Sequence, residues 1–296
     1  MSGVRSKPAE PALDPNAIAF QFVKDLAAEL STGKVDLPSF PDVAVRVRRV
    51  LADEKTTVDQ VVRVIGSEPA LAARLLKMAN SAALNRSGKS LTDLRTAINR
   101  MGYNMVRSAA ITFAMAQIRL AGNLKRIEPH LETLWRHSTH VAATSYTIAR
   151  KFTTINPDEA LLTGLLHSIG KLYILTRAEG HAELFADQGA IEQIMRDWHA
   201  SIGKAILENW DFAEEVANAV AEHEDITREH SGPTDLTDIV TVGNMMAAFA
   251  DNPDNIELNM QGIRAFEKMQ IDGAKCLDVM RESQDEINAL RQALGS

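Results

Sequence analysis

Eight histidines are the residues of this sequence best suited to metal chemistry, and all of them lie between residues 130 and 230. They are His130, His137, His140, His167, His181, His199, His223 and His230. A neutral imidazole binds borderline divalent metals such as zinc, nickel or iron, so several imidazoles on converging helices would form a metal site. A histidine in an apolar helix is more often a hydrogen-bonded core group. The sequence therefore leaves a metal site and a buried polar network both open.

One histidine lies in the apolar run Leu165-Leu166-His167-Ser168-Ile169-Gly170-Lys171-Leu172. The residue after His167 is Ser168, whose hydroxyl is a weak and neutral metal ligand. Hard divalent cations prefer anionic oxygens, and two metal ions about 3.5–4 Å apart need a bridging anion. Lys171 is a candidate contact for a phosphate or another small anion, although such a lysine more often caps a helix end or stays in solvent.

Other signatures of catalysis are missing from the sequence, which has no glycine-rich phosphate loop, no Ser-His-Asp arrangement and no Cys-x-x-Cys pair. Its one cysteine, Cys276, cannot form an intrachain disulfide, which favours a reducing cytoplasm. The first 15 residues are polar and proline-rich, unlike a signal peptide. The longest apolar stretch, residues 109–118, is too short to span a bilayer. We expect a cytoplasmic protein without membrane contact.

Helices are expected to position the histidines, because the sequence is rich in Ala, Leu, Val and Met and shows no convincing alternation with period 2. Thr57 with Gln60 predicts a capping box, Asn156 predicts a helix start, and Gly102 predicts a left-handed helix end. The predicted helices span about residues 16–30, 42–51, 58–65, 70–80, 94–101, 104–118, 128–152, 157–167, 182–188, 191–210, 213–222, 236–250, 258–269 and 273–294. The predicted fold class is all-α.

These elements predict a two-part helical bundle with a C-terminal helical extension. Residues 1–15 contain three prolines and are expected to be disordered. Residues 16–125 form the first helical half, and residues 126–252 form the second half, which contains the histidines. Residues 253–296 form the extension.

The two halves differ in charge. Residues 37–125 carry 14 Lys and Arg against 6 Asp and Glu, whereas residues 126–296 carry 14 against 28. A basic half can attract nucleic acid. However, Arg46, Arg63 and Arg74 are spread over separate helices, with no interleaved aromatic residues on which bases would stack. The sequence therefore disfavours nucleic-acid binding.

Motifs in both halves resemble one known family. The first half contains Leu37-Pro38-x-x-Pro41, Ile65-x-x-Glu68-Pro69-Ala70-Leu71, Leu75-Leu76-x-x-Ala79-Asn80-Ser81 and Ala97-Ile98-x-x-Met101-Gly102. The second half continues with His137, Gly164-Leu165-Leu166-His167 and His199-x-x-x-Gly203-x-x-x-x-x-x-Trp210. In order and spacing these residues resemble the HDOD domain, a helical module related to the HD and HD-GYP metal-dependent phosphohydrolases. Glu68 and Met101 depart from the family pattern, which favours Asp and Leu there. The resemblance covers roughly residues 20–250.

The resemblance implies that four imidazoles converge. His137 corresponds to the first metal ligand of HD enzymes and His167 to the histidine of their His-Asp pair. His199 and His223 correspond to additional histidine ligands of the HD-GYP relatives. These four residues are expected to form a single-metal site or a vestigial polar network.

The same resemblance implies that both signature acids are replaced. Ser168 stands in place of the aspartate of the His-Asp pair, and Asn244 in place of the terminal aspartate. Each side chain is expected to bond a nearby backbone carbonyl. Without these carboxylates a metal pair lacks its bridging anion, so we expect no required cofactor and at most one divalent ion such as zinc, nickel or iron.

HDOD domains, by the same resemblance, act in bacterial signal transduction and regulation. We therefore expect a non-catalytic regulatory module that binds another protein, with a nucleotide or another small anion as a candidate ligand of the old metal cleft. The alternative is a divergent metal-dependent phosphohydrolase that recruits Glu159, Glu222 or Glu224 as a substitute carboxylate.

Overall fold

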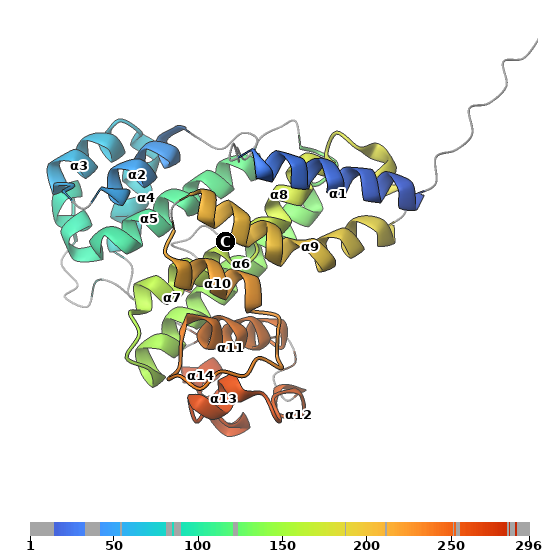
Figure 1. Cartoon of the computed structure of the whole chain (residues 1–296). Coiled ribbons are helices and arrows are strands. Elements are labelled where there is room, and N and C mark those ends of the chain that lie inside the picture. Colours follow the sequence, from blue (N-terminus) through green and yellow to red (C-terminus); the bar gives the residue numbers. More distant parts are fainter. Residues whose placement is uncertain are drawn as a thin grey trace, which may run out of the picture.

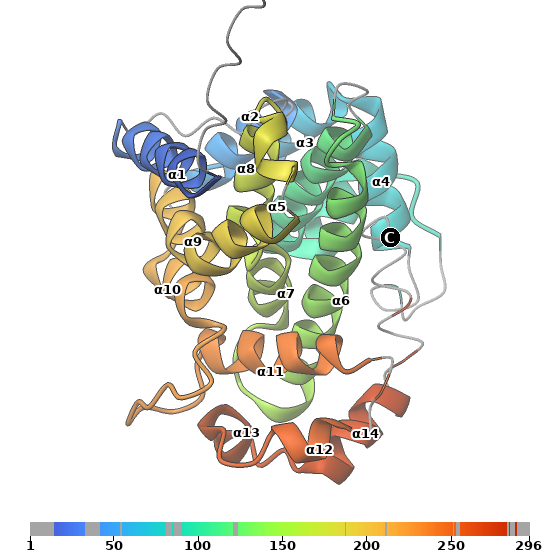
Figure 2. The same cartoon turned by 90° about the vertical axis from the view of Figure 1, so that its right-hand side faces the viewer.

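The computed structural model describes residues 15–32, 42–53, 55–80, 85, 90–120, 124–186, 188–210, 212–250, 252, 255–282, 284 and 288. Within these ranges the chain is all-α and contains no β-strand, as the sequence predicts (Figures 1 and 2). The segment predicted to be disordered lies outside the described residues except for Pro15, which begins the first helix. The motif Leu37-Pro38-x-x-Pro41 and Ser81 also lie outside them.

The first half contains five helices. They are α1 (Pro15–Ser31), α2 (Asp42–Ala52), α3 (Val58–Gly66), α4 (Pro69–Ala79) and α5 (Leu94–Leu120). The Thr57–Gln60 capping box of α3 is present as predicted. The two helices predicted on either side of Gly102 are both present within the range of α5, which is kinked at this glycine because its φ of +74° is not helical. Asp93 caps α5 by accepting a 2.7 Å hydrogen bond from the backbone N–H of Thr96.

The second half supplies the helices that contain or follow the histidines. They are α6 (Glu128–Phe152), α7 (Pro157–Leu166), α8 (Ile169–Ala178), the 3₁₀ helix η1 (Ala182–Phe185), α9 (Gln188–Asn209), α10 (Glu214–Glu222) and α11 (Leu236–Ala248). Asn156 caps α7 as predicted, by accepting from the N–H of Asp158. Helix α8 was not predicted.

The core is built around α6, which packs against α7 and α11. Small residues permit this close packing. A Cβ on Gly164 would lie 2.9 Å from the Oγ of Ser145, and a Cβ on Gly243 would lie 2.6 Å from the same oxygen. Helix α5 packs against α7 and joins the two halves. Helix α1 packs against α9 and η1, so it lies on the second half although the sequence places it in the first.

The C-terminal extension lies below α11 in Figure 1. It contains α12 (Ile256–Asn259), α13 (Arg264–Lys268) and α14 (Gly273–Glu282). The single helix predicted for residues 258–269 is therefore wrong, because Gly262, with a φ of +77°, separates two short helices. None of the described helices has the length and apolar character needed to cross a membrane.

Candidate metal centre

Four helices bring the four family-matched histidines to one place. His137 lies within α6 and His199 within α9. His167 and His223 are the residues that end α7 and α10. A helix end turns the chain, so these two rings can point into the space between the helices.

The four imidazole rings form a continuous row. The ring centroids of His137 and His167 are 5.3 Å apart, those of His167 and His223 are 5.0 Å apart, and those of His223 and His199 are 5.5 Å apart. Each pair meets edge to face. His167, His199 and His223 are at most 1% exposed, whereas His137 is partly exposed. The structure therefore gathers the four histidines that the sequence singles out.

Backbone carbonyls fix the orientation of three of these rings. In His167 the Nδ1 atom lies 2.6 Å from the carbonyl oxygen of Gly164. The Nδ1 atom of His199 lies 2.7 Å from the carbonyl oxygen of Met195, and that of His223 lies 2.9 Å from the carbonyl oxygen of Val220. A carbonyl oxygen only accepts, so each Nδ1 carries the proton. In a neutral ring the Nε2 lone pair is then free to bind a cation, which is the arrangement typical of metal-binding histidines.

Burial keeps these rings neutral. Desolvation lowers the pKa of His223 to about 4 and holds the pKa of His167 well below its usual value. The neighbouring rings of His223 and His137 lower the pKa of His167 further. Desolvation also lowers the pKa of His137, against a hydrogen bond with Asn244 that raises it. Near pH 7 these three imidazoles are therefore lone-pair donors rather than cations.

Ser168 and Asn244, which the resemblance places at the positions of the two acids, contact this row directly. The Oγ of Ser168 lies 2.7 Å from the Nε2 of His167, and the Oδ1 of Asn244 lies 2.8 Å from the Nε2 of His137. The prediction that both side chains bond backbone carbonyls is wrong, because Ser168 bonds the Nε2 of His167 and the Oδ1 of Asn244 accepts from the Nε2 of His137. Both contacts are neutral, so neither position contributes charge to the row.

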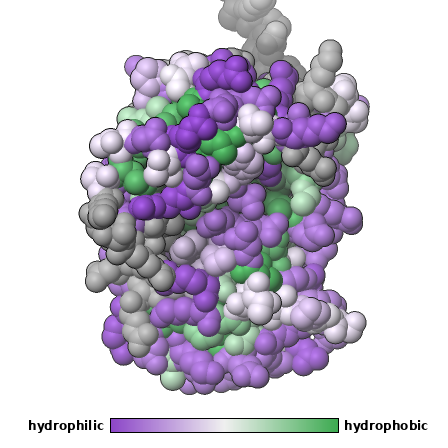
Figure 3. All heavy atoms as spheres, turned by 90° about the vertical axis from the view of Figure 1, so that its left-hand side faces the viewer, coloured by the Kyte–Doolittle hydropathy of each residue, from purple (hydrophilic) through white to green (hydrophobic). Residues whose placement is uncertain are grey.

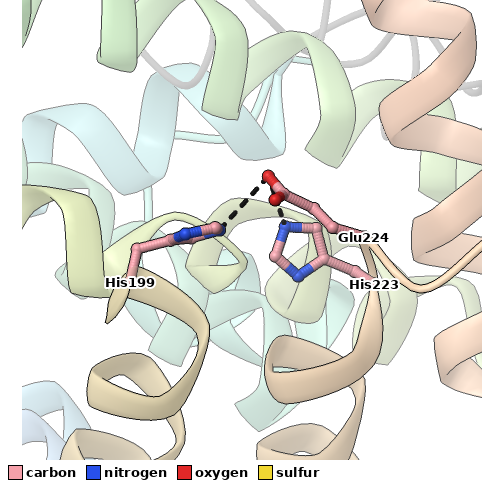
Figure 4. A group of neighbouring side chains, drawn as sticks. All are labelled: His199, His223 and Glu224. Atoms are coloured by element: carbon pink, nitrogen blue, oxygen red, sulfur yellow. Dashed lines mark ion pairs between the residues drawn. The ribbon is translucent and has the colours of Figure 1, made fainter. Parts of the chain in front are cut away.

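One carboxylate reaches the other end of the row. The Oε1 of Glu224 lies 3.2 Å from the Nε2 of His199 and 3.7 Å from the Nε2 of His223 (Figure 4). The same oxygen accepts a 3.1 Å hydrogen bond from the Nζ of Lys171. The close contact with His199, and Lys171 nearby, hold the pKa of Glu224 well below its usual range although partial burial opposes this. Glu224 is therefore an anion at any physiological pH.

The residues at this end fit one divalent ion. The Nε2 atoms of His199 and His223 are buried without a hydrogen-bond partner, since the contacts with Glu224 satisfy ion-pair distance but not hydrogen-bond geometry. These two nitrogens and the carboxylate oxygen all lie within 4.8 Å of one another. Two imidazoles and one carboxylate suit zinc, nickel or iron. The set does not fit a metal pair, because Glu224 is the one carboxylate that contacts these histidines among the described residues.

The other two carboxylates weighed as substitutes have different partners. Glu222 accepts a 2.7 Å hydrogen bond from the Nε of Arg228. Glu159 lines a separate cavity together with Arg228 and Asp235. Of the three acids, the structure places only Glu224 in contact with the row.

A second group of acids and a histidine lies in the segment before α11. His230 lies 3.0 Å from the Oδ2 of Asp238, and Arg228 lies 2.7 Å from the Oδ2 of Asp235. Lys268 on α13 approaches both His230 and Asp238. Two cations thus already neutralise these acids, so the group is an ion-pair network that ties α13 to the second half. The side chain of His230 is accordingly only 21% exposed.

Two further histidines lie apart from the row and have contrasting surroundings. The side chain of His181 is 44% exposed and lies 3.2 Å from Glu183. The Nδ1 atom of His130 is buried without a hydrogen-bond partner. His130 also lines a cavity of about 470 Å³ with His137 and Lys171. An anion in this cavity would share Lys171 with Glu224.

Comparisons with known proteins agree with this arrangement of helices. A solved structure from Shewanella amazonensis SB2B, described as a "Putative metal-dependent phosphohydrolase", is 26% identical with a TM-score of 0.73, over 94% of this chain and 99% of that chain. A solved structure of a "Putative signal transduction protein" from Marinobacter aquaeolei VT8 is 18% identical, with a TM-score of 0.59. The match covers 97% of this chain and 68% of that chain. The fold is therefore that of the HD-like helical proteins.

The HDOD domain family matches residues 37–226, and the chain belongs to this family. An "Uncharacterized protein" of Treponema pallidum (strain Nichols) is 23% identical over 259 residues. These cover 83% of this chain, which spans about half (48%) of that relative's length.

Proposed function

We propose that this protein is a regulatory HDOD module that binds another protein and does not hydrolyse phosphate esters. Membership of the HDOD family and the fold shared with a protein described as acting in signal transduction support the regulatory part. In this proposal His199, His223 and Glu224 hold at most one divalent ion. The ion, when bound, would supply a single positive charge centre that fixes α9 against the end of α10.

The charge balance of the histidine row supports the absence of hydrolysis. A di-metal centre brings four positive charges, and carboxylates normally bridge and neutralise them. The described contacts of the row include one carboxylate, Glu224, and Lys171 adds a positive charge beside it. Ser168 and Asn244 contact the row with neutral atoms. A second divalent ion would therefore meet uncompensated charge in a buried site.

The cavity beside the row gives the module a place for a regulatory ligand. It combines the apolar residues Leu134, Leu175 and Met195 with the polar groups of His137 and Lys171. A nucleotide or another small anion would find an apolar wall for its body and an ammonium group for its charge. Its binding would weaken the Lys171–Glu224 contact and thereby act on the metal ligands.

Metal content and phosphodiesterase activity test the non-catalytic part together. We expect the purified protein, loaded with Mn²⁺, Fe²⁺ or Ni²⁺, to retain no more than one ion per chain and to show no turnover of phosphodiester or nucleotide substrates. A Glu224→Gln variant should weaken retention of the ion at least about tenfold, because the anionic ligand is lost. Glu222→Gln is the matched control, since Glu222 pairs with Arg228 instead.

Affinity purification of the tagged protein, followed by mass spectrometry, tests the protein-binding part. We expect a partner that co-purifies in a fixed ratio and is retained by a His167→Ala variant, since the proposal requires no chemistry from His167. Absence of any such partner would contradict it.

One observation favours the alternative function, a divergent phosphohydrolase. Glu224 is anionic and lies against His199 and His223, as a substitute carboxylate would. A stoichiometric metal pair, with turnover that His167→Ala abolishes, would establish this alternative and exclude the adaptor.

A further inference from the structure

An apolar groove of about 590 Å³ runs between α1 and α9, and none of the four histidines of the row lines it. One wall contains Phe20, Val23 and Ala27 of α1, and the other contains Ile194 and Trp198 of α9. Figures 1 and 2 both show these two helices side by side. Phe20 is 72% exposed and Trp198 is 44% exposed. Two large rings on facing walls thus lie open to solvent.

This groove is not a by-product of loose packing. A neighbouring face of α1 buries Phe22 and Leu26 to 4% and 3% exposure, so the helix is firmly seated on α9 and η1. Residues 20, 23 and 27 recur with helical spacing and form a second apolar stripe, in which Val23 packs partly against the core while Phe20 and Ala27 are exposed. Helix α1 precedes residue 37, where the family match begins, so the groove is not formed by the HDOD domain alone. On the face drawn in Figure 3, hydrophobic areas lie among hydrophilic residues.

The charges on the two walls are opposite in sign. Lys24 of α1 is exposed and has no ion-pair partner among the described residues. Asp197 of α9 is exposed and accepts a 2.7 Å hydrogen bond from the side chain of Gln193. A surface with a cation on one wall and an anion on the other is complementary to itself after a two-fold rotation. The apolar stripe of α1 and the groove beside it are likewise both present on every copy of the chain.

We propose that the occupant of this groove is a second copy of this chain. In the two-fold dimer, α1 of each copy lies against the groove of the other. Phe20 then packs on the partner's Trp198, and Lys24 pairs with the partner's Asp197. Burial of four large rings at the centre, surrounded by two ion pairs, matches the usual anatomy of a stable interface. This proposal is independent of the metal site and of the function proposed above.

Sedimentation equilibrium of the full chain tests the proposal. We expect a monomer–dimer equilibrium between about 1 µM and about 200 µM protein. Phe20→Glu should weaken the dimer at least about tenfold, because it places a charge in the apolar centre. Leu258→Glu is the matched control: Leu258 is 75% exposed on α12, away from the groove, and this variant should leave the equilibrium unchanged. Both residues are exposed, so neither change threatens folding.

A charge exchange tests the register of the two copies. Lys24→Glu and Asp197→Lys should each weaken the dimer, since each places like charges opposite one another. The double variant should recover most of the association, because the pairs form again with reversed signs. A chain that stays monomeric throughout, or a dimer indifferent to Phe20→Glu, would overturn the proposal and leave the groove to a different protein. Failure of the double variant to recover would overturn the proposed pairing.

Discussion

At the scale of single residues, two neutral side chains limit the number of metal ions that we expect the histidine row to hold. Ser168 and Asn244 each lie within hydrogen-bond distance of an Nε2 atom, that of His167 and that of His137. Oxygen atoms are therefore present where metal ligands would be needed. What these positions lack is negative charge, and charge is what a pair of divalent ions requires.

Restoring the two acids should therefore restore capacity for a second ion. We expect the Ser168→Asp, Asn244→Asp double variant to bind two Mn²⁺ or Fe²⁺ ions per chain, measured by elemental analysis after gel filtration. Asn244→Asp keeps the shape of the side chain, whereas Ser168→Asp must find room at a fully buried position, so circular dichroism should confirm folding. A folded double variant that still binds no more than one ion would contradict the charge argument.

The buried imidazoles also predict how stability depends on pH. In the unfolded chain a histidine takes up a proton near pH 6.5, but burial lowers the pKa of His223 to about 4 in the folded protein and lowers that of His167 as well. Between these values the unfolded state binds more protons. The free energy of unfolding should therefore be highest above pH 6.5 and fall as the pH falls toward 4.

For His223 alone the full loss, reached below pH 4, is on the order of 3 kcal/mol, of which about 2 kcal/mol falls between pH 7.5 and 5. Urea unfolding of chelator-treated protein at about pH 7.5, 6 and 5 measures it, and a His223→Gln variant should lose part of the slope. Glu224 contributes in the same direction but at lower pH, because its pKa is held below the usual value of 4.5. A flat profile from pH 7.5 to 5 would show that the rings are not kept neutral by burial.

The four histidines could be predicted from the sequence only through the family resemblance. The contacts between their individual atoms could not be predicted. Glu224 could be weighed as a substitute ligand because it follows His223, yet Glu159 and Glu222 looked equally suitable. Which of these acids contacts the histidines depends on where the chain turns after α10 and on which acid pairs with Arg228. The same turn brings His230 to Asp238, which no spacing in the sequence indicated.

At the scale of helices, the crossing of α8 and α9 positions His199. A Cβ on Gly170 would lie 2.0 Å from the carbonyl oxygen of His199 and 2.9 Å from the N of Gly203. The two backbones thus touch where α9 presents its metal ligand. Residue 170 must be glycine for His199 to stay at this distance from His223.

Gly170→Ala should therefore destabilise the protein and loosen the metal site together. We expect a loss of about 1–3 kcal/mol in the free energy of unfolding, measured by urea denaturation, because the backbones must separate. Affinity for Zn²⁺ or Ni²⁺ should fall in parallel, since His199 moves with α9. Gly180→Ala is the matched control, because a Cβ there meets nothing within 4 Å. Unchanged stability in Gly170→Ala would show that the helices can part at no cost.

The predicted helices agree best with the structure where local signals decide. The bounds of α6 and the caps of α3 and α7 match the sequence prediction. Helix α8 was missed because Gly170 near its start weakens the local helix signal, whereas close packing on α9 requires that glycine. The split between α12 and α13 was missed because Gly262 was not weighted as a helix end.

At the scale of the whole molecule, a bound ion would couple the histidine site to global stability. His199 comes from α9, whereas His223 and Glu224 follow α10, and the unfolded chain offers no matching set of ligands. An ion that binds only the folded state stabilises it by about 2.7 kcal/mol at a hundredfold excess over its dissociation constant.

We therefore expect Zn²⁺ or Ni²⁺ to raise the Tm of chelator-treated protein by at least about 4 °C, measured by circular dichroism. His199→Ala should lose this response, whereas His181→Ala, at a half-exposed position just before η1, should keep it. A Tm that neither ion changes would mean that the Nε2 atoms of His199 and His223 bind no metal and belong to a buried polar network. Regulation by this module would then have to depend on its protein contacts alone, because no ion would link ligand binding in the cavity beside His137 to the packing of α9.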